Sequence, residues 1–261
     1  WIMHRDIDIQ RELLDVGDFF ICASERQRDY WMGMLTARDR LDRATYKQDP
    51  TLRSLIDIVP YGCPSGEPVA ERAVLKGVHP AIGTDDIVVL WTGGAWQWFD
   101  PQLALRAFVK AHEQEPRLRL YVMGGKPSGE AHLPMMDSAL QFYEAAKRSG
   151  LVDTAIVFGP WVDYDERVGY LLEADMAVIT TKDVAETRLA FRSRVLDHYW
   201  TGLPTITTDG DILAVELQRE GAGIVVPIGD EDALRDAMLT LATDDVARER
   251  MSAAAASLAA R

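Results

Sequence analysis

From about residue 85 onward, short runs of β-branched and other apolar residues alternate regularly with amphipathic runs. Such short, nearly continuous apolar runs are typical of strands buried on both faces of a parallel sheet. The predicted strands are residues 87–92, 118–123, 155–159, 176–180, 204–208 and 222–226. Because strands and helices alternate, the pattern predicts an α/β fold with a Rossmann-like, doubly wound parallel sheet.

Capping residues mark several of the helices expected between these strands. Asp100 precedes Pro101, which suits the first position of a helix. Asp230 precedes a run that places its apolar residues on one side of a helix. Asp163, followed three residues later by Glu166, matches a capping-box pattern and predicts a helix that begins there.

Residues 1–84 do not follow this alternation. Residues 19–23 and 56–60 are expected to be strands, with a helix after the first and a Gly/Pro-rich linker after the second. A strand–helix–strand piece that ends in a linker is typical of the tail of a preceding α/β domain. The chain also begins at Trp1, within a charged segment, which suggests a fragment of a longer protein.

The composition excludes several classes of partner. The chain has 28 Lys and Arg against 41 Asp and Glu, a net charge of −13, so it is expected to repel nucleic acids and anionic lipids. Two cysteines are too few for a disulfide framework. The sequence has neither a signal peptide nor an apolar run of transmembrane length, so we expect no transmembrane segment and a cytoplasmic location.

Two glycine-containing loops follow the first two predicted strands. Gly93 and Gly94 indicate either a close approach of the backbone to a phosphate or only a tight turn. Trp96 and Trp98 indicate a docking face for a sugar, a base or another domain, or else core packing. Lys126, in the second loop, either pairs with a diphosphate or is a solvated surface residue.

A run of charged residues precedes the fifth predicted strand. A helix over residues 193–200 would place Arg194, Asp197 and His198 on one face. Arg192 lies just before it. Basic side chains at the start of a helix are unfavourable for its dipole, which favours an anion bound there. The alternative is a surface network in which Arg194 pairs with Asp197 and His198.

Taken in order, these motifs resemble the C-terminal half of a GT-B glycosyltransferase, of the retaining class related to glycosyltransferase family 4 (group 1). They are WTGG, VMGG, VFGPW, EAD, WTGLPTITTDG and VPIGD. The earlier segments ASERQRDYWMGML and IDIVPYG resemble the last units of that family's acceptor-side domain. The resemblance implies that residues 1–72 are a remnant of the N-terminal domain with its linker. Residues 73–261 would form the C-terminal, Rossmann-like domain that binds the nucleotide-sugar donor.

The family's signature is a Glu, seven further residues and a second Glu. When it is aligned through Gly202 and Pro204, Leu189 falls on the first Glu and Asp197 on the second. The resemblance therefore implies that Asp197 accepts hydrogen bonds from the ribose hydroxyls. The first Glu contacts the donor hexose in the family, and Glu186, three residues upstream, is the candidate to replace it.

The family's usual Arg and Lys of the first loop are absent, and Lys126 is the nearest remaining cation. Arg192 and Arg194 are expected to reach the diphosphate instead. Residues 159–162 would border the base pocket, with Trp161 either beside the base or as a lid on its own helix. The candidate donor-binding residues are Gly93, Gly94, Lys126, Trp161, Glu186, Arg192, Arg194 and Asp197.

The resemblance implies transfer of a hexose from a nucleoside diphosphate sugar to an unknown acceptor, with retention and without a metal or other cofactor. Its further partner would be the chain's own missing N-terminal domain, and the fragment is expected to be inactive alone. No catalytic residue can be assigned. Two alternatives are a nucleotide-sugar epimerase of the same architecture and a non-catalytic GT-B-like scaffold module.

Overall fold

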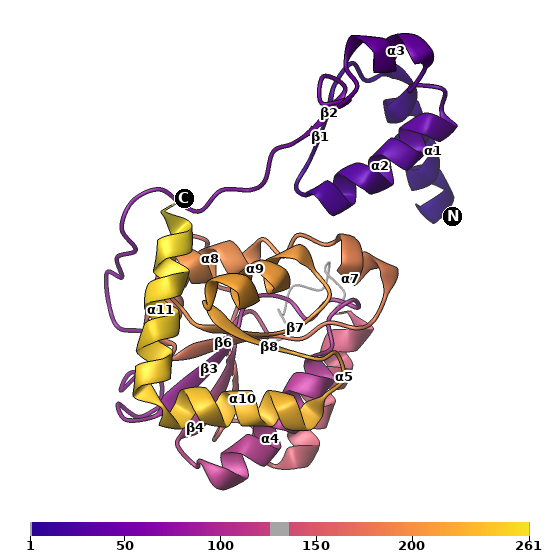
Figure 1. The fold of residues 1–261 in the computed structure, drawn as a ribbon. Coiled ribbons are helices and arrows are strands. Elements are labelled where there is room, and N and C mark those ends of the chain that lie inside the picture. Colours follow the sequence, from indigo (N-terminus) through magenta and orange to yellow (C-terminus); the bar gives the residue numbers. More distant parts are fainter. Residues whose placement is uncertain (1, 126–135, 261) are drawn as a thin grey trace. The chain divides into compact units, whose positions relative to one another are not determined.

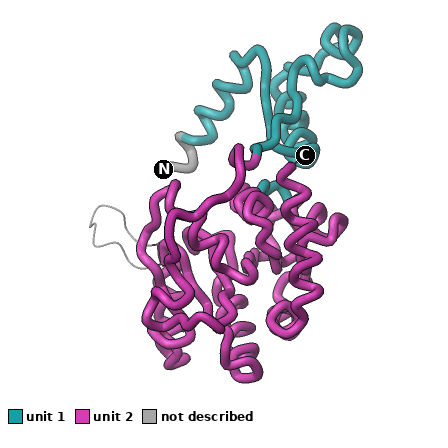
Figure 2. Tube along the Cα trace, turned by 90° about the vertical axis from the view of Figure 1, so that its left-hand side faces the viewer, with its two compact units in different colours: residues 1–62, 188–191 teal, residues 63–187, 192–261 magenta. Residues whose placement is uncertain are grey.

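The chain divides into two compact units, which Figure 2 shows in different colours. The computed structural model describes residues 2–125 and 136–260. Unit 1 comprises residues 1–62 and 188–191, and unit 2 comprises residues 63–187 and 192–261. The division after residue 62 lies earlier in the chain than the boundary after residue 72 that the sequence suggests.

Unit 1 contains a small parallel sheet and three helices. In chain order they are α1 (Ile2–Val16), β1 (Phe20–Cys22), α2 (Glu25–Ala37), α3 (Arg43–Gln48) and β2 (Ile56–Ile58). The two strands pair in parallel, with Phe20 opposite Ile56. Ser24 begins α2 by accepting a hydrogen bond from the backbone N–H of Gln27. The strands and α2 lie where the sequence predicts them, whereas α1 is an element that the hydrophobic pattern does not predict.

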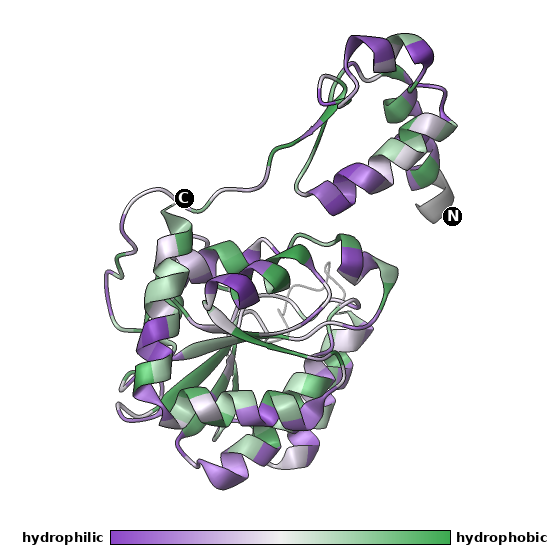
Figure 3. Cartoon of the chain, viewed as in Figure 1, coloured by the Kyte–Doolittle hydropathy of each residue, from purple (hydrophilic) through white to green (hydrophobic). Residues whose placement is uncertain are grey.

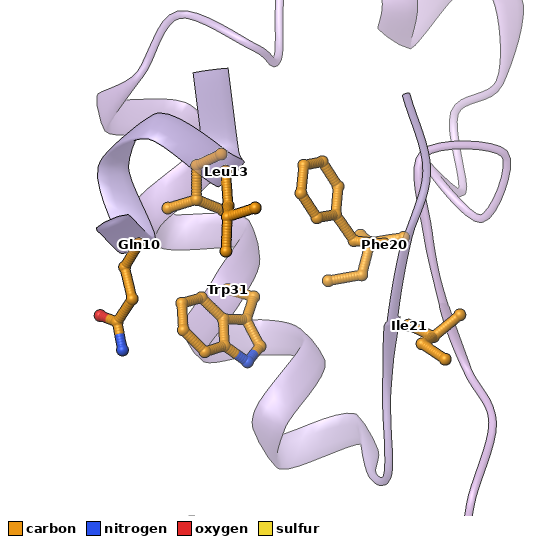
Figure 4. A pocket seen from close by; sticks show the side chains of 7 residues that line it. Gln10, Leu13, Phe20, Ile21 and Trp31 are labelled. Atoms are coloured by element: carbon orange, nitrogen blue, oxygen red, sulfur yellow. The ribbon is translucent and has the colours of Figure 1, made fainter. Parts of the chain in front are cut away.

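An apolar groove of about 200 Å³ lies between α1, β1 and α2 (Figure 4). Leu13 of α1, Trp31 of α2, and Phe20 and Ile21 of β1 line it. Leu13 is 58% exposed and Ile21 is 62% exposed. The groove therefore leaves large apolar side chains of unit 1 in contact with solvent.

Unit 2 is built on a six-stranded parallel sheet. The strands are β3 (Ile87–Trp91), β4 (Leu118–Val122), β5 (Ile156–Phe158), β6 (Met176–Ile179), β7 (Thr205–Thr208) and β8 (Gly223–Val226). Their order across the sheet is β5-β4-β3-β6-β7-β8, and every pairing is parallel. All six predicted strands are present, and this order confirms the Rossmann-like, doubly wound fold.

Helices cover both faces of this sheet. They are α4 (Pro101–Gln114), α5 (Asp137–Ser149), α6 (Arg167–Glu173), α7 (Ala185–Leu189), α8 (Arg194–Trp200), α9 (Ile212–Glu220), α10 (Glu231–Thr243) and α11 (Asp245–Ala259). Figure 1 shows α4 and α10 side by side below the strands, with α8 and α9 on the opposite side and α11 against them. No helix of the described ranges has both the length and the apolar character to cross a membrane.

Burial on both faces explains why the strands are recognisable in the sequence. Val88, Val89 and Leu90 of β3 are completely buried, and so are Met176 and Ala177 of β6. Figure 3 shows this apolar character along the central strands, while the outer helices alternate hydrophobic and hydrophilic residues. Transfer of these side chains from water stabilises the sheet and leaves only its ends for polar chemistry.

The capping predictions are correct at two helices and wrong at a third. Asp100 accepts a hydrogen bond from the N–H of Leu103 at 3.1 Å, and Asp230 caps α10 in the same way. The side chain of Asp163 caps no helix, because a separate turn follows it and α6 begins only at Arg167. The carbonyl of Asp163, not its carboxylate, accepts the N–H of Arg167 at 3.2 Å.

Within unit 2, the EAD motif before β6 attaches the segment ahead of β3 to the rest of the unit. The Glu173 carboxylate accepts three backbone N–H groups, those of Val74, Leu75 and Lys76, at 2.6 to 2.9 Å. Asp175 accepts the N–H of Val88 and the ammonium of Lys76, both at 2.7 Å. Because Leu75 is fully buried, these bonds also satisfy backbone donors at the edge of the core.

We predict that Glu173→Ala lowers the free energy of unfolding by about 2 kcal/mol, because three N–H groups lose a charged acceptor. Urea denaturation followed by circular dichroism measures this change. Glu249→Ala is the matched control, since Glu249 is exposed on α11 and should shift the midpoint little. Equal stability of the two variants would contradict the tethering role of Glu173.

Candidate functional site

Gly93 and Gly94 form a turn at the carboxyl end of β3, where other chain segments approach the backbone closely. Gly93 has φ = 81°, in the left-handed region that favours glycine. A β-carbon there would lie 3.5 Å from Nη2 of Arg194. A β-carbon at Gly94 would lie 3.1 Å from Nε1 of Trp96, closer than an ordinary contact. The two glycines thus bring a cation and an indole ring against the main chain.

Arg194, the first residue of α8, has a positive charge without an ionic partner in the described chain. Its guanidinium carbon lies 4.2 Å from the ring centroid of Phe99, a cation–π contact, and no hydrogen bond or ion pair to another described residue adds to it. Burial, together with the nearby charge of Arg192, lowers the pKa of Arg194 to about 9, so it remains protonated at neutral pH. An anion that reached this half-buried cation would be stabilised by it.

Arg192 differs from Arg194 because its charge is already compensated. Its Nη1 and Nη2 donate to the two carboxylate oxygens of Glu186, at 2.9 and 2.6 Å. Its Nε lies 3.9 Å from a carboxylate oxygen of Asp211 and makes no hydrogen bond within the described residues. The structure therefore brings two predicted donor-site residues, Arg192 and Glu186, together as an ion pair. Leu189, which the resemblance aligns with the family's first Glu, groups with unit 1.

Asp197 forms a two-pronged ion pair with a residue that the sequence did not single out. Arg167, at the start of α6, donates from Nε and Nη2 to the two oxygens of Asp197, at 3.0 and 2.9 Å. The ring of Tyr164 lies 3.4 Å from the guanidinium carbon and stacks on it. Arg167 is buried, whereas the side chain of Asp197 is 27% exposed. The carboxylate is thus fixed in direction and still open to solvent.

His198 links α8 to the residue that follows β3 and to the first residue of β7. Its imidazole is completely buried and lies 3.0 Å from Oγ1 of Thr92 and 2.9 Å from Oγ1 of Thr205. The Thr205 hydroxyl donates to the carbonyl of Leu203, so it accepts from Nδ1 of His198, and Nε2 then accepts from Thr92. Burial, with the charge of Arg194 nearby, lowers the pKa of His198 to about 3 and keeps the ring neutral.

The alternative interpretation, a surface network in which Arg194 pairs with Asp197 and His198, is therefore wrong. All three residues lie on α8, as predicted, but each side chain contacts a different part of unit 2. Arg194 lies over Phe99, Asp197 binds α6, and His198 enters the core. Side chains three or four residues apart on one helix can pair with each other. Here each of the three side chains instead binds a partner from another element of unit 2.

The second glycine loop, after β4, contacts an exposed indole. A β-carbon at Gly124 would lie 3.3 Å from Cε3 of Trp161, and Gly124 donates its N–H to the carbonyl of Pro160. Trp161 is 75% exposed, so it packs against the glycine turn with most of its surface open. Lys126, the remaining predicted cation of this loop, lies outside the described residues.

Trp96 and Trp98 form a stacked pair in the loop after β3. Their ring centroids are 5.7 Å apart with an angle of 12° between the planes, and each residue is 38% exposed. Trp98 also contacts Phe99, the residue beneath Arg194, at a centroid distance of 6.3 Å. The alternative of core packing does not describe this pair, because more than a third of each residue's surface remains accessible.

Sequence reasoning missed Arg167, Thr92 and Phe99. Arg167 lies in a charged turn whose helical capping was assigned to the wrong residue, so its position at the start of α6 was not visible. Thr92 and Phe99 flank the glycine turn in the sequence, but their partners come from α8, about a hundred residues later. In the described chain, no group of three or more His, Cys, Asp and Glu is placed to hold a metal ion.

Comparison with known families gives one match over most of unit 2. The model of the family described as "Glycosyl transferases group 1" matches residues 86–244. A search of curated proteins finds no match to the chain. The family match covers the loops after β3, β4, β5 and β6, and therefore all the side chains of the candidate site.

Solved structures share the fold at low sequence identity. Anabaena Alr3699/HepE, solved with UDP and glucose, matches 98% of this chain and 62% of its own, with 14% identity and a TM-score of 0.65. Sucrose-phosphate synthase from Thermosynechococcus elongatus matches 98% and 60%, with 17% identity and a TM-score of 0.57. The C-terminal domain of the group 1 protein LpcC from Francisella tularensis matches 67% and 84%, with 15% identity and a TM-score of 0.54.

These likenesses agree on a GT-B glycosyltransferase fold. The present chain spans 62% of the Anabaena protein and 60% of the synthase.

We predict that the buried, neutral His198 makes the protein lose stability in mild acid. The pKa of His198 is about 3 in the folded protein, whereas an unfolded histidine has a pKa near 6.5, so the unfolded chain binds the extra proton between these values. Between pH 6.5 and 5 this loss amounts to about 1.5 kcal/mol.

Urea denaturation at several pH values, compared with His198→Gln, measures this contribution. The variant retains side-chain donors and acceptors for Thr92 and Thr205 but has no group that titrates in this range. Its free energy of unfolding should depend less on pH between 5 and 6.5 than that of the parent. Identical pH dependence in the two proteins would show that His198 does not carry the effect.

Proposed function

Because the chain belongs to the group 1 glycosyltransferases, we propose that unit 2 binds the nucleoside diphosphate part of a nucleotide-sugar donor. In this proposal the whole protein transfers a hexose to an acceptor with retention. The proposed donor site lies at the carboxyl ends of the strands, where open parallel sheets bind ligands.

The observation that carries the proposal is the guanidinium of Arg194. It is half-buried, protonated at neutral pH and stacked on Phe99, with no carboxylate opposite it among the described residues. Its position against the Gly93 backbone lets a ligand approach both a cation and the main chain. A diphosphate has the charge that this site lacks. The nearby Arg192 is less suited to this role, because Glu186 already neutralises it.

The remaining parts of a nucleotide have candidate partners on the same edge. Asp197 is proposed to accept the ribose hydroxyls, since it is partly exposed and Arg167 fixes its direction. Carboxylate oxygens have four lone-pair sites, so two bonds from Arg167 leave acceptor capacity. Trp161 is proposed to stack on the base, with its exposed ring held beside Gly124.

The proposed chemistry requires stabilisation of the departing diphosphate, whose negative charge grows in the transition state. Arg194 and the backbone of the Gly93 turn supply positive charge without a metal or a cofactor. No residue of this chain is assigned as nucleophile or general base. The acceptor pocket would come mainly from an N-terminal domain of which unit 1 is the proposed remnant, and the chain alone is expected not to turn over.

Unit 1 has the exposed surface that such a remnant would have. The groove between α1, β1 and α2 leaves Leu13 and Ile21 largely in solvent. A two-stranded parallel sheet is small for an independent fold, since parallel sheets are usually buried on both faces. We propose that the rest of the N-terminal domain covers this groove.

A non-catalytic scaffold remains the second candidate, and one observation favours it. Leu189 occupies the position of the family's first Glu, and Glu186, the proposed replacement, is bound to Arg192. A scaffold does not need an arginine that lacks an ionic partner among the described residues. A measurement of nucleotide binding therefore distinguishes the scaffold from the glycosyltransferase.

We expect isothermal titration of the 261-residue chain with UDP, GDP and ADP to show binding of one of them. Arg194→Ala should weaken that binding at least tenfold, about 1.4 kcal/mol, because the diphosphate loses a charge-assisted contact. Arg250→Ala is the matched control, since it removes an equal charge from an exposed position on α11. Absence of binding to all three nucleotides would overturn the donor-site proposal and leave the scaffold.

We also expect the ribose to be recognised through Asp197. The nucleotide that binds should do so about tenfold more tightly than its 2′-deoxy form, since a lost hydrogen bond to a carboxylate has this effect. Arg167→Lys keeps the charge but loses the two-pronged geometry, so the preference should fall below about threefold. Arg72→Lys, at a largely exposed arginine of the same unit, should keep the preference. A preference unchanged by Arg167→Lys would exclude this role of Arg167.

A further inference from the structure

The strand order of unit 2 also orders the groups at its carboxyl edge. Trp161, which follows β5, lies against the Gly124 turn after β4. Arg194 lies against the Gly93 turn after β3. Trp98 comes next, because its carbonyl accepts a backbone N–H from the segment after β6. Along β5, β4, β3 and β6 the edge therefore presents an aromatic ring, a cation and then a second aromatic group.

This order has a chemical counterpart. A nucleoside diphosphate sugar consists of a flat base, an anionic diphosphate and a ring with apolar C–H faces, joined in that sequence. Four neighbouring strands span three strand spacings, about 14–15 Å, so an extended ligand of this kind could contact the whole row. In the proposed function Trp161 binds the base and Arg194 binds the diphosphate. The Trp96–Trp98 pair is then the group left to contact the sugar ring.

The indole pair is held in place by main-chain bonds, which makes it suitable as a binding platform. Phe99 donates its N–H to the carbonyl of Trp96 at 3.0 Å, and Lys182 donates its N–H to the carbonyl of Trp98 at 3.2 Å. The ammonium of Lys182 donates to the carbonyl of Gln97 at 2.7 Å. These bonds fix the loop before any ligand arrives, which lowers the entropy cost of binding.

Phe99 connects the platform to the cation. It is buried, with the guanidinium carbon of Arg194 4.2 Å from its centroid and the ring of Trp98 at 6.3 Å. The cation and the Trp98 ring thus share one buried neighbour, Phe99. Because both tryptophans are partly exposed and nearly parallel, the stacked pair offers apolar indole surface to a ligand.

We propose that Trp96 and Trp98 bind the sugar ring of the donor whose diphosphate Arg194 holds. This inference rests on the proposed function and extends it to the sugar. The indole face packs on the C–H face of the ring, and the hydroxyls point away from it into solvent or towards polar neighbours. The sequence leaves a sugar, a base or another domain open as the partner of this pair. The base already has a proposed partner, Trp161, at the other end of the row.

The test compares a nucleoside diphosphate with its sugar conjugate on the same variants. The probes are UDP with UDP-glucose, GDP with GDP-mannose, and ADP with ADP-glucose, measured by isothermal titration with the full chain. Trp98→Leu should weaken binding of the sugar conjugate at least fivefold and change binding of the free diphosphate less than twofold. Trp98→Phe should restore most of the affinity, because a flat ring remains.

Three further variants provide a substitute for Trp98→Leu and two comparisons. Trp96→Leu tests the same platform if Trp98→Leu does not fold, as judged by its thermal melt. Leu172→Ala changes an equally exposed apolar residue on α6 and should affect neither probe. Trp161→Leu should weaken both probes alike, since its proposed partner is the base.

The inference is overturned if the folded variant, Trp98→Leu or in its place Trp96→Leu, binds the sugar conjugate as the parent does, or binds both probes equally less tightly. The first result would assign the pair to another occupant, such as a neighbouring domain, and the second to a general structural role. If the parent binds no nucleoside diphosphate at all, the proposed function itself fails, and this inference fails with it.

Discussion

The buried hydrogen-bonded histidine of α8 is the constraint on which the arrangement of the site depends. His198 lies between Thr92, directly after β3, and Thr205 at the start of β7, and its imidazole is excluded from water. A buried imidazole must satisfy both nitrogens, so this residue determines how α8 approaches the sheet. Arg194, one helical turn earlier, is thereby placed over Phe99 and against the Gly93 turn. A neutral His198 also adds no charge beside that guanidinium.

Three arginines lie on or near α8, and they differ in the groups that they contact. Arg192 is neutralised by Glu186, and Arg167 is fixed on Asp197, so both act mainly on other protein groups. Arg194 has an aromatic ring beneath it and, among the residues that the structure describes, no carboxylate opposite it. Burial without an ionic partner is unfavourable for a cation, and a bound anion removes part of that cost. The same residue type therefore supports structure at two positions, and in the proposed function it binds the ligand at the third.

The elements that the sequence predicts well are those whose pattern reflects burial. All six strands of unit 2 were visible because a central parallel strand is apolar on both faces, as the fully buried residues of β3 show. Asp100 was a correct cap because Pro101 leaves few alternatives for the chain. Asp163 was a wrong prediction of a helix cap, since a turn intervenes before α6. The sequence pattern did not predict α1, because its apolar residues are spread among charged ones.

For the site, the sequence by itself determined which groups are available: the glycine turns, the tryptophans and the charged run of α8, all near strand ends. It also carried enough ordered motifs to identify the family that residues 86–244 match. Only the tertiary structure decided how these groups are paired. Arg167 meets Asp197 across 30 positions of the chain, and Thr92 meets His198 across 106. Hydrophobic periodicity specifies which side of a helix is buried, but ion pairs and hydrogen bonds depend on distances that are set when helices pack on the sheet.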